Sequence, residues 1–170
     1  MPQLVVFLDV GVGALRLRRC CLARNRQCSL NPCPFLPNMT WLGPPGQVHA
    51  VIAKTWAQGA LSVSLNPSGG DISISAQRDD STNKLVISLV NTNAKKANIT
   101  LLINGFTLSS NSVQVTTISG TDLTQTNTPS NPLAISPIVS FLNFGNGINN
   151  ITVVGYSATT LVLTGTPGTL

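Results

Sequence analysis

The chain has 170 residues, a formal net charge of +5 at pH 7, and only 9% charged residues. All five acidic residues are aspartates, so a mechanism that needs a pair of glutamates is excluded within this chain. The single histidine, His49, argues against histidine-rich metal sites and against a histidine–carboxylate relay. No apolar run reaches the length of about eighteen residues that predicts a membrane-spanning helix.

The net positive charge comes from the first third of the chain. Residues 1–60 carry six basic side chains against Asp9, whereas the basic and acidic side chains of residues 61–170 balance. A surface that binds nucleic acid needs clustered positive charge on the folded domain, and residues 61–170 carry no net charge. The distribution therefore predicts neither nucleic acid nor a membrane as a partner.

Residues 1–35 are interpreted as a disordered or non-native N-terminal segment. The apolar stretch from Leu4 to Leu15 is interrupted by Asp9 and two glycines, and its positive charges follow it, whereas a secretory signal has them in front. An organelle transit segment is the alternative that an arginine-rich, acid-poor start leaves open. The sequence thus predicts no signal peptide, and the compartment stays open.

The four cysteines lie close together in the same segment. Their spacing, C-C-x6-C-x4-C, lacks the paired CxxC of zinc sites, so it predicts no metal centre. Disulfides would require export of the chain. The residues are Cys20, Cys21, Cys28 and Cys33.

The spacing of apolar residues predicts one helix over residues 44–57. Pro44 and Pro45 suit a helix start, and Val48, Ile52 and Trp56 recur at helical spacing on one face. Gly59 supplies a stop signal.

His49 lies beside the apolar face of this helix, where we interpret it as a packed or capping side chain. No partner for catalysis accompanies it.

After Gly59 the apolar period changes to two, which is typical of half-buried strands. The alternating positions are Leu61–Leu65, Ile72–Ser75, Leu85/Ile87/Leu89, Ile99/Leu101/Ile103, Val113/Val115, Ile151/Val153 and Leu161/Leu163. Turn-forming residues separate them at 66–70, 79–81, 91–93, 104–105, 127–130 and 146–147. Strands at this spacing without intervening helices predict an all-β, antiparallel, jelly-roll-like β-sandwich preceded by one helix.

Three segments fit the N-glycosylation acceptor pattern: Asn38-Met39-Thr40, Asn98-Ile99-Thr100 and Asn150-Ile151-Thr152. The asparagine, serine and threonine content alone predicts about three such matches by chance. The pattern matters only if the chain enters the secretory pathway.

From about Leu36 to Val162 the motifs follow one another in a characteristic order. The helix PGQVHAVIAKTWA leads through Gly59 into LSVSLN, and the strands that follow match the pattern S.R......L.I.LVN.....A.I.L.I.G. The matching positions are Ser75, Arg78, Leu85, Ile87, Leu89, Val90, Asn91, Ile99, Leu101, Ile103 and Gly105, followed by Ser130-Asn131-Pro132, Pro137 and the closing Tyr156–Leu161. This order is similar to the C-terminal end of glycoside hydrolase family 51 α-L-arabinofuranosidases. The resemblance implies that Trp41 and Trp56 fill the interface between barrel and sandwich, with a sugar-stacking platform as the alternative.

The resemblance implies a division into a last barrel helix with linker at residues 36–59 and a C-terminal β-sandwich domain at residues 60–166. It implies that the parent enzyme releases terminal α-L-arabinofuranosides of arabinan or arabinoxylan, in L-arabinose metabolism. Enzymes of this family are retaining and place two glutamates on a barrel, at a separation of about 5 Å. This chain has no glutamate, so we assign no catalytic, cofactor-binding or metal-binding residue and expect it to be inactive alone.

The expected partner is the missing catalytic barrel domain, with a plant-type polysaccharide as the parent's substrate. In the family that this chain resembles, strands from before the barrel complete the sandwich. If they are missing, an uncovered sheet edge and helix face would favour aggregation.

Two other functions stay open. A non-catalytic carbohydrate-binding module needs exposed aromatic platforms, and residues 61–170 offer Phe106, Phe141, Phe144 and Tyr156. A structural sandwich of another glycoside hydrolase, or an adhesion domain, is the second. The lack of a Cys…Trp…Cys arrangement in residues 61–170 argues against a true immunoglobulin domain.

Overall fold

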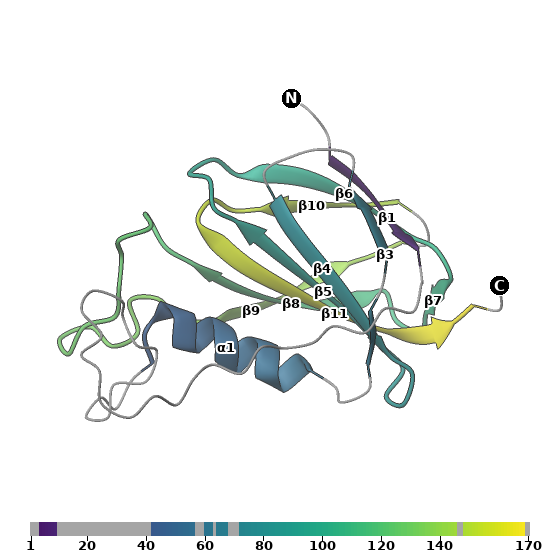
Figure 1. Cartoon of the computed structure of the whole chain (residues 1–170), viewed down its shortest axis with the longest axis horizontal. Helices are drawn as coiled ribbons and strands as arrows, with labels where there is room; N and C mark the ends of the chain where they lie inside the picture. The colour runs from purple at the N-terminus through teal and green to yellow at the C-terminus, as the bar shows by residue number, and fades with distance from the viewer. Residues whose placement is uncertain are drawn as a thin grey trace.

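The computed structural model describes residues 4–9, 42–56, 60–62, 64–67, 72–145 and 148–168. Within these ranges the chain forms one helix and eleven strands (Figure 1). The elements in chain order are β1 (Leu4–Asp9), α1 (Pro44–Thr55), β2 (Leu61–Ser62), β3 (Ser64–Pro67), β4 (Ile72–Asp79), β5 (Lys84–Asn91), β6 (Ala97–Ile103), β7 (Phe106–Leu108), β8 (Ser112–Ser119), β9 (Ile138–Asn143), β10 (Ile148–Val153) and β11 (Ser157–Pro167).

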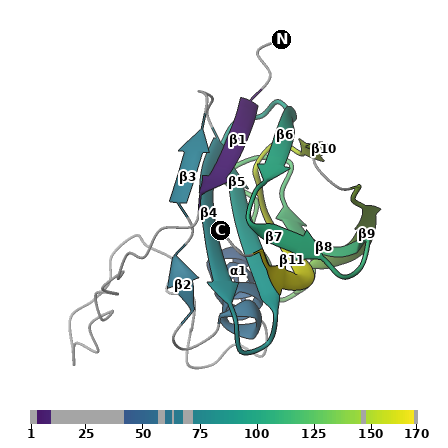
Figure 2. The same cartoon turned by 90° about the vertical axis from the view of Figure 1, so that its right-hand side faces the viewer.

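The strands form two sheets that face each other (Figure 2). The smaller sheet has four strands in the order β10-β6-β1-β3. The larger has seven, in the order β2-β4-β5-β11-β8-β9, with β7 paired to the end of β11. The pairs are antiparallel except β1 with β6, which is parallel. The predicted β-sandwich with one preceding helix is therefore confirmed, with one parallel pair that the sequence analysis did not foresee.

The core lies between the two sheets and is aliphatic. The alternating residues of β5 and β11 point inward from the larger sheet, and those of β6 and β10 meet them from the smaller one. Burying each such side chain contributes about 1.5–3 kcal/mol. The residues that these four strands contribute to the hydrophobic core are Leu85, Ile87, Leu89, Ile99, Leu101, Ile151, Val153, Leu161 and Leu163. The period-two pattern identified this face correctly in each of these strands.

Helix α1 lies along the outer face of the larger sheet, where it packs against β8 and β11 (Figure 1). The Gln77 side chain of β4 donates a hydrogen bond from Nε2 to the carbonyl of Thr55 at 3.2 Å. Val86 and Ile118 alternate with core residues yet are buried, because the outer face is covered as well. The outer face is therefore packed at Val86 of β5 and Ile118 of β8, whereas Val90, on the same face of β5, is exposed.

The helix begins where the two prolines predicted and ends two residues before the predicted boundary. Pro44 and Pro45 occupy the first two helical positions after Gly43. The chain leaves the helix at Trp56, whose backbone is extended and whose N–H still bonds to the carbonyl of Ile52 at 2.8 Å. Gly59, the predicted stop, lies outside the described residues. No described helix is long and apolar enough to cross a membrane.

Strand β1 comes from the segment that the sequence analysis interpreted as disordered or non-native. It lies between β6 and β3 and pairs with both. A short apolar run without alternation does not reveal its structure by periodicity, so the sequence could not distinguish this strand from an unstructured stretch. Residues 10–35 lie outside the described residues, and the boundaries at 1–35, 36–59 and 60–166 stay predictions.

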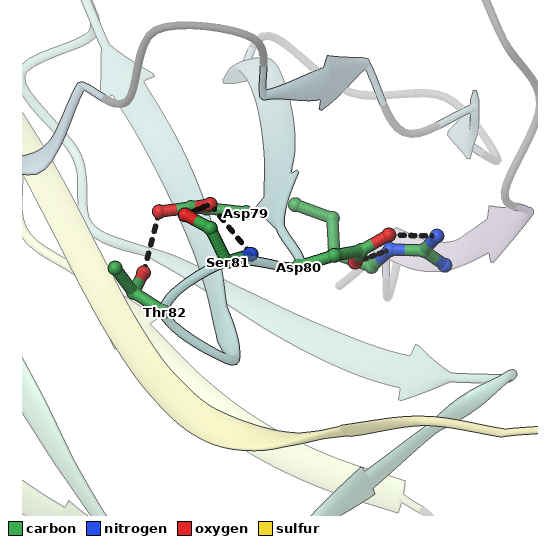
Figure 3. A network of polar contacts seen from close by, with 5 residues as sticks. Asp79, Asp80, Ser81 and Thr82 are labelled. Atoms are coloured by element: carbon green, nitrogen blue, oxygen red, sulfur yellow. Dashed lines mark hydrogen bonds and ion pairs between the residues drawn. The ribbon is translucent and has the colours of Figure 1, made fainter.

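The turn predicted at residues 79–81 joins β4 to β5 and is held by its own side chains (Figure 3). The Asp79 carboxylate accepts hydrogen bonds from the backbone N–H of Ser81 at 3.0 Å, from its hydroxyl at 2.6 Å, and from the Thr82 hydroxyl at 2.5 Å. Asp80 forms an ion pair with Arg78. These bonds, from the Ser81 and Thr82 hydroxyls first, hold the pKa of Asp79 below its ordinary value.

We expect Asp79 to make the protein less stable in acid. A carboxyl whose pKa is lower in the folded than in the unfolded state stabilises the fold above the unfolded pKa, and this contribution is lost as pH falls through the folded pKa. Thr82→Val removes one donor and should reduce the loss of stability between neutral pH and acid. Thr82→Ser keeps the hydroxyl and should behave like the original chain in urea unfolding at each pH. Equal acid sensitivity in Thr82→Val and the original would contradict this role.

Candidate docking surface

The acidic side chains that the structure describes do not gather into a site. Asp79 and Asp80 lie in the β4–β5 turn and Asp122 in the loop after β8. Asp122 accepts hydrogen bonds from the backbone N–H of Thr124 at 2.7 Å and from its hydroxyl at 2.5 Å, which lower its pKa. Among the described residues, no three histidine, cysteine or acidic residues come together. These aspartates act as turn residues, as interpreted from the sequence for the pair at 79–80.

His49 of α1 and Trp56, which follows the helix, both have exposed side chains. For His49 this contradicts the packed half of its interpretation as a packed or capping side chain, and the capping half stays a prediction. The side chain of His49 is exposed because α1 turns only part of its surface to the sheet, and Gly46 is its one buried residue. Trp56 is 48% exposed at the end of the helix. Trp41 and all four cysteines lie outside the described residues.

The most conspicuous surface feature is strand β9, all six residues of which are exposed. Four of them are large and apolar: Ile138 is 64% exposed, Val139 54%, Phe141 66% and Leu142 38%. Leu133, in the loop before the strand, is also exposed. We call these five residues the β9 strip. Exposed apolar groups that adjoin one another along one element mark interaction surfaces more often than scattered single residues do.

Both faces of β9 are open. Phe141 and Val139 lie opposite Gln114 and Thr116 of β8, on the outer face of the larger sheet. Leu142 lies opposite Val113, on the core face. Val113 is fully buried whereas Leu142 is exposed, so the smaller sheet covers β8 but not β9.

Strand β9 also forms one edge of the larger sheet, since it pairs with β8 and with no other described strand. Figure 2 shows it at the margin of the sandwich, on the side away from β2 and β3. Natural proteins protect a sheet edge with charges, prolines, bulges or a covering element. The sequence IVSFLN contains neither a charge nor a proline. The edge is therefore suited to contact another protein surface.

Asn127 ties the loop before β9 to the segment before α1. Its side-chain Nδ2 donates to the carbonyl of Leu42 at 2.7 Å and to that of Ile135 at 2.9 Å, while its Oδ1 accepts from the N–H of Ile135 at 2.7 Å. Asn127 is buried, so these bonds satisfy a polar group that would otherwise destabilise the fold. The sequence indicates Asn127 only as a turn residue. Its contact with Leu42 fixes the start of α1 relative to the loop that leads into the β9 strip.

The turn after Asn127 also follows the sequence prediction. The backbone N–H of Thr128 donates to the carbonyl of Asn131 at 3.1 Å, and that of Asn131 returns a bond to Thr128 at 3.0 Å. Asn131 belongs to the Ser130-Asn131-Pro132 motif on which the resemblance partly rested. The motif therefore forms a closed turn that precedes Leu133 and β9.

No protein-family model matches the chain, and no curated protein matches its sequence. Solved structures do share its fold. The family 51 arabinofuranosidase of Xanthomonas axonopodis pv. citri superposes with a TM-score of 0.63 and 20% identity over 73% of this chain and 27% of its own. The arabinose-bound MgGH51 α-L-arabinofuranosidase gives a TM-score of 0.65 and 20% identity over 80% of this chain and 22% of its own.

A third structure, the thermostable family 51 α-L-arabinofuranosidase of Thermotoga petrophila RKU-1, gives a TM-score of 0.62 and 15% identity over 72% of this chain and 29% of its own. The chain thus spans between 22% and 29% of the length of these enzymes. The greater part of each enzyme has no counterpart here. The resemblance drawn from the sequence is confirmed as one of fold: this chain has the β-sandwich that family 51 arabinofuranosidases carry over a minor part of their length.

Proposed function

We propose that this chain is the C-terminal accessory β-sandwich of an arabinofuranosidase-like glycoside hydrolase, and that it supports a catalytic barrel without taking part in the chemistry. The observation that carries the proposal is the β9 strip, an apolar edge strand open on both faces. A domain that functioned alone in water would gain nothing from such an edge.

The chemistry of the chain supports the same role. Retaining glycosidases need two carboxyl groups about 5 Å apart, on opposite sides of the bond that they cleave. Asp79 and Asp122 instead hold turns, and their carboxylates accept hydrogen bonds from neighbouring hydroxyls. The catalytic carboxylates of the parent would therefore come from the part of the protein that has no counterpart in this chain.

The substrate of the parent would be a terminal α-L-arabinofuranoside of a plant polysaccharide such as arabinan or arabinoxylan. This assignment rests on the fold shared with the arabinofuranosidases and on the motif order from the helix to the closing strand. The purified chain should release no product from an aryl α-L-arabinofuranoside. Turnover by the pure chain would overturn the proposal.

If the chain were instead a carbohydrate-binding module, it should bind polysaccharide by itself. Sugar-binding sandwiches stack rings on sugar faces, and of the four aromatic residues within residues 61–170, Phe106 and Phe144 are buried in the core. Phe141 is exposed, but within an apolar strip. In affinity electrophoresis the chain should migrate through arabinoxylan without retardation. Retardation in arabinoxylan would favour the binding module over the accessory domain.

The β9 strip should make the isolated chain associate with itself. A phenylalanine that becomes buried in a contact contributes about 1.5–3 kcal/mol, so its loss weakens association by about tenfold or more. Phe141→Lys should therefore shift sedimentation-equilibrium profiles toward monomer. Val154→Lys adds the same charge at an exposed apolar position outside the strip and should leave the association unchanged. Equal effects of the two variants would show that net charge, and not the strip, controls association.

A further inference from the structure

Two of the three glycosylation patterns lie directly opposite each other in the smaller sheet. Asn98-Ile99-Thr100 is in β6 and Asn150-Ile151-Thr152 is in β10. In the antiparallel register Asn98 pairs with Thr152 and Asn150 pairs with Thr100. Each acceptor asparagine therefore faces the threonine of the other pattern. Chance accounts for the number of such tripeptides in the chain, but not for the pairing of two of them across neighbouring strands.

The strand alternation turns both acceptors outward. The middle residues Ile99 and Ile151 are buried in the core between the sheets. Their neighbours in sequence point to the opposite face. Asn98 and Asn150 are both exposed on that outer face. A substituent on either amide would project into solvent and would displace no core side chain.

The hydrogen bonds across the strands use the amide oxygens and leave the amide nitrogens available. The Thr100 hydroxyl donates to Oδ1 of Asn150 at 2.7 Å, and the Thr152 hydroxyl donates to Oδ1 of Asn98 at 2.9 Å. N-glycosylation substitutes Nδ2 and keeps Oδ1 as an acceptor. Both hydrogen bonds can therefore persist in a glycosylated protein.

We infer that Asn98 and Asn150 form a pair of N-glycan acceptors on the outer face of the smaller sheet. In the transfer, Nδ2 bonds to C1 of the first sugar of a lipid-linked diphosphate oligosaccharide. The bond between C1 and the diphosphate oxygen breaks, the diphosphate leaves with the electron pair, and the amide nitrogen loses one proton to a base of the transferase. The two asparagines are diagonal neighbours, about 7–8 Å apart, which leaves room for two chains that extend away from the sheet.

The test expresses the full chain behind a cleavable secretion signal in eukaryotic cells. Asn38→Gln is included throughout, because the third pattern lies outside the described residues. We expect two glycans on the translocated protein, one glycan after either Asn98→Gln or Asn150→Gln, and none in the double variant. Enzymatic release in ¹⁸O-labelled water converts each occupied asparagine to a labelled aspartate, which peptide mass spectrometry locates.

Two controls separate the acceptor pattern from the fold. Asn93→Gln changes an exposed asparagine outside any pattern and should leave two glycans. Thr100→Val removes the pattern of Asn98 together with the hydroxyl that bonds to Asn150, and should leave one glycan, at Asn150. Cell-free translation with microsomes gives the same count without depending on export. A translocated chain in which either asparagine is mostly unmodified would overturn the inference.

Discussion

Replacing Leu161 with alanine should lower the free energy of unfolding by about 2–5 kcal/mol. Leu161 lies in the middle of β11, opposite Ile87 of β5 and Val115 of β8, and is 0% exposed. Both neighbouring strands are held in register there, so the core cannot collapse easily into the space that the side chain leaves. Denaturant unfolding followed by far-ultraviolet circular dichroism measures the loss.

Leu123→Ala is the matched control for this effect. Leu123 is 73% exposed in the loop after β8, and its truncation should change stability by no more than about 0.5 kcal/mol. A small effect at Leu161 would mean that the two sheets do not enclose the core described above. A large effect at Leu123 would mean that the loop packs against something absent from the described contacts.

Replacing Asn91 with alanine should lower the free energy of unfolding by about 3 kcal/mol, because it leaves several buried polar groups without partners. Asn91 is 1% exposed at the end of β5. Its Nδ2 donates to the carbonyls of Lys95 at 2.9 Å, Val154 at 3.0 Å and Val153 at 3.4 Å, and its Oδ1 accepts from the N–H of Asn93 at 3.0 Å. One side chain thus fastens the β5–β6 turn to the connection between β10 and β11.

Two comparisons isolate the role of this amide. Asn93→Ala changes an exposed side chain in the same turn and should have little effect on the unfolding midpoint. Asn91→Asp keeps the accepting oxygen but replaces the donor with a negatively charged oxygen beside three carbonyls. It should destabilise the protein at neutral pH at least as much as alanine does. A stable Asn91→Asp protein would contradict the assignment of Nδ2 as the essential donor.

The sequence predicted the central strands well because their environment is the one that the alternation pattern assumes. Leu85, Ile87 and Leu89 face a single core, and the turn at residues 79–81 is closed by local side-chain bonds. Asn91 begins the turn predicted at residues 91–93, and its Oδ1 accepts a hydrogen bond from the N–H of Asn93. In these cases a local pattern determines the local structure, whereas the bonds from Asn91 to the carbonyls of Val153 and Val154 join distant residues.

The strands that were missed depend on distant neighbours. Strand β1 is apolar without alternation, and its pairing with β3 and β6 involves residues far along the chain. Strand β9 follows Pro137 and carries apolar residues on both faces, so its pattern has no period. A periodicity argument cannot distinguish a strand that is covered on both faces from one that is open on both faces.

The sequence predicted that a docking surface exists, but not which strand forms it. The motif order predicted a missing partner and an uncovered edge, but it placed neither on β9. Asn127 had no sequence signal beyond its turn propensity, because its bond to the carbonyl of Leu42 joins residues far apart in the chain. The paired acceptors Asn98 and Asn150 were visible as patterns, whereas their opposition required the register of β6 and β10.

The position of β1 makes the smaller sheet discontinuous along the chain. The strand between β6 and β3 precedes α1, while its neighbours follow it. The sheet therefore cannot close until the amino-terminal strand has been captured, which places a long loop closure late in folding. A single proteolytic cut between Asp9 and Pro44 would turn that closure into a bimolecular association, so the stability of the nicked protein would depend on its concentration.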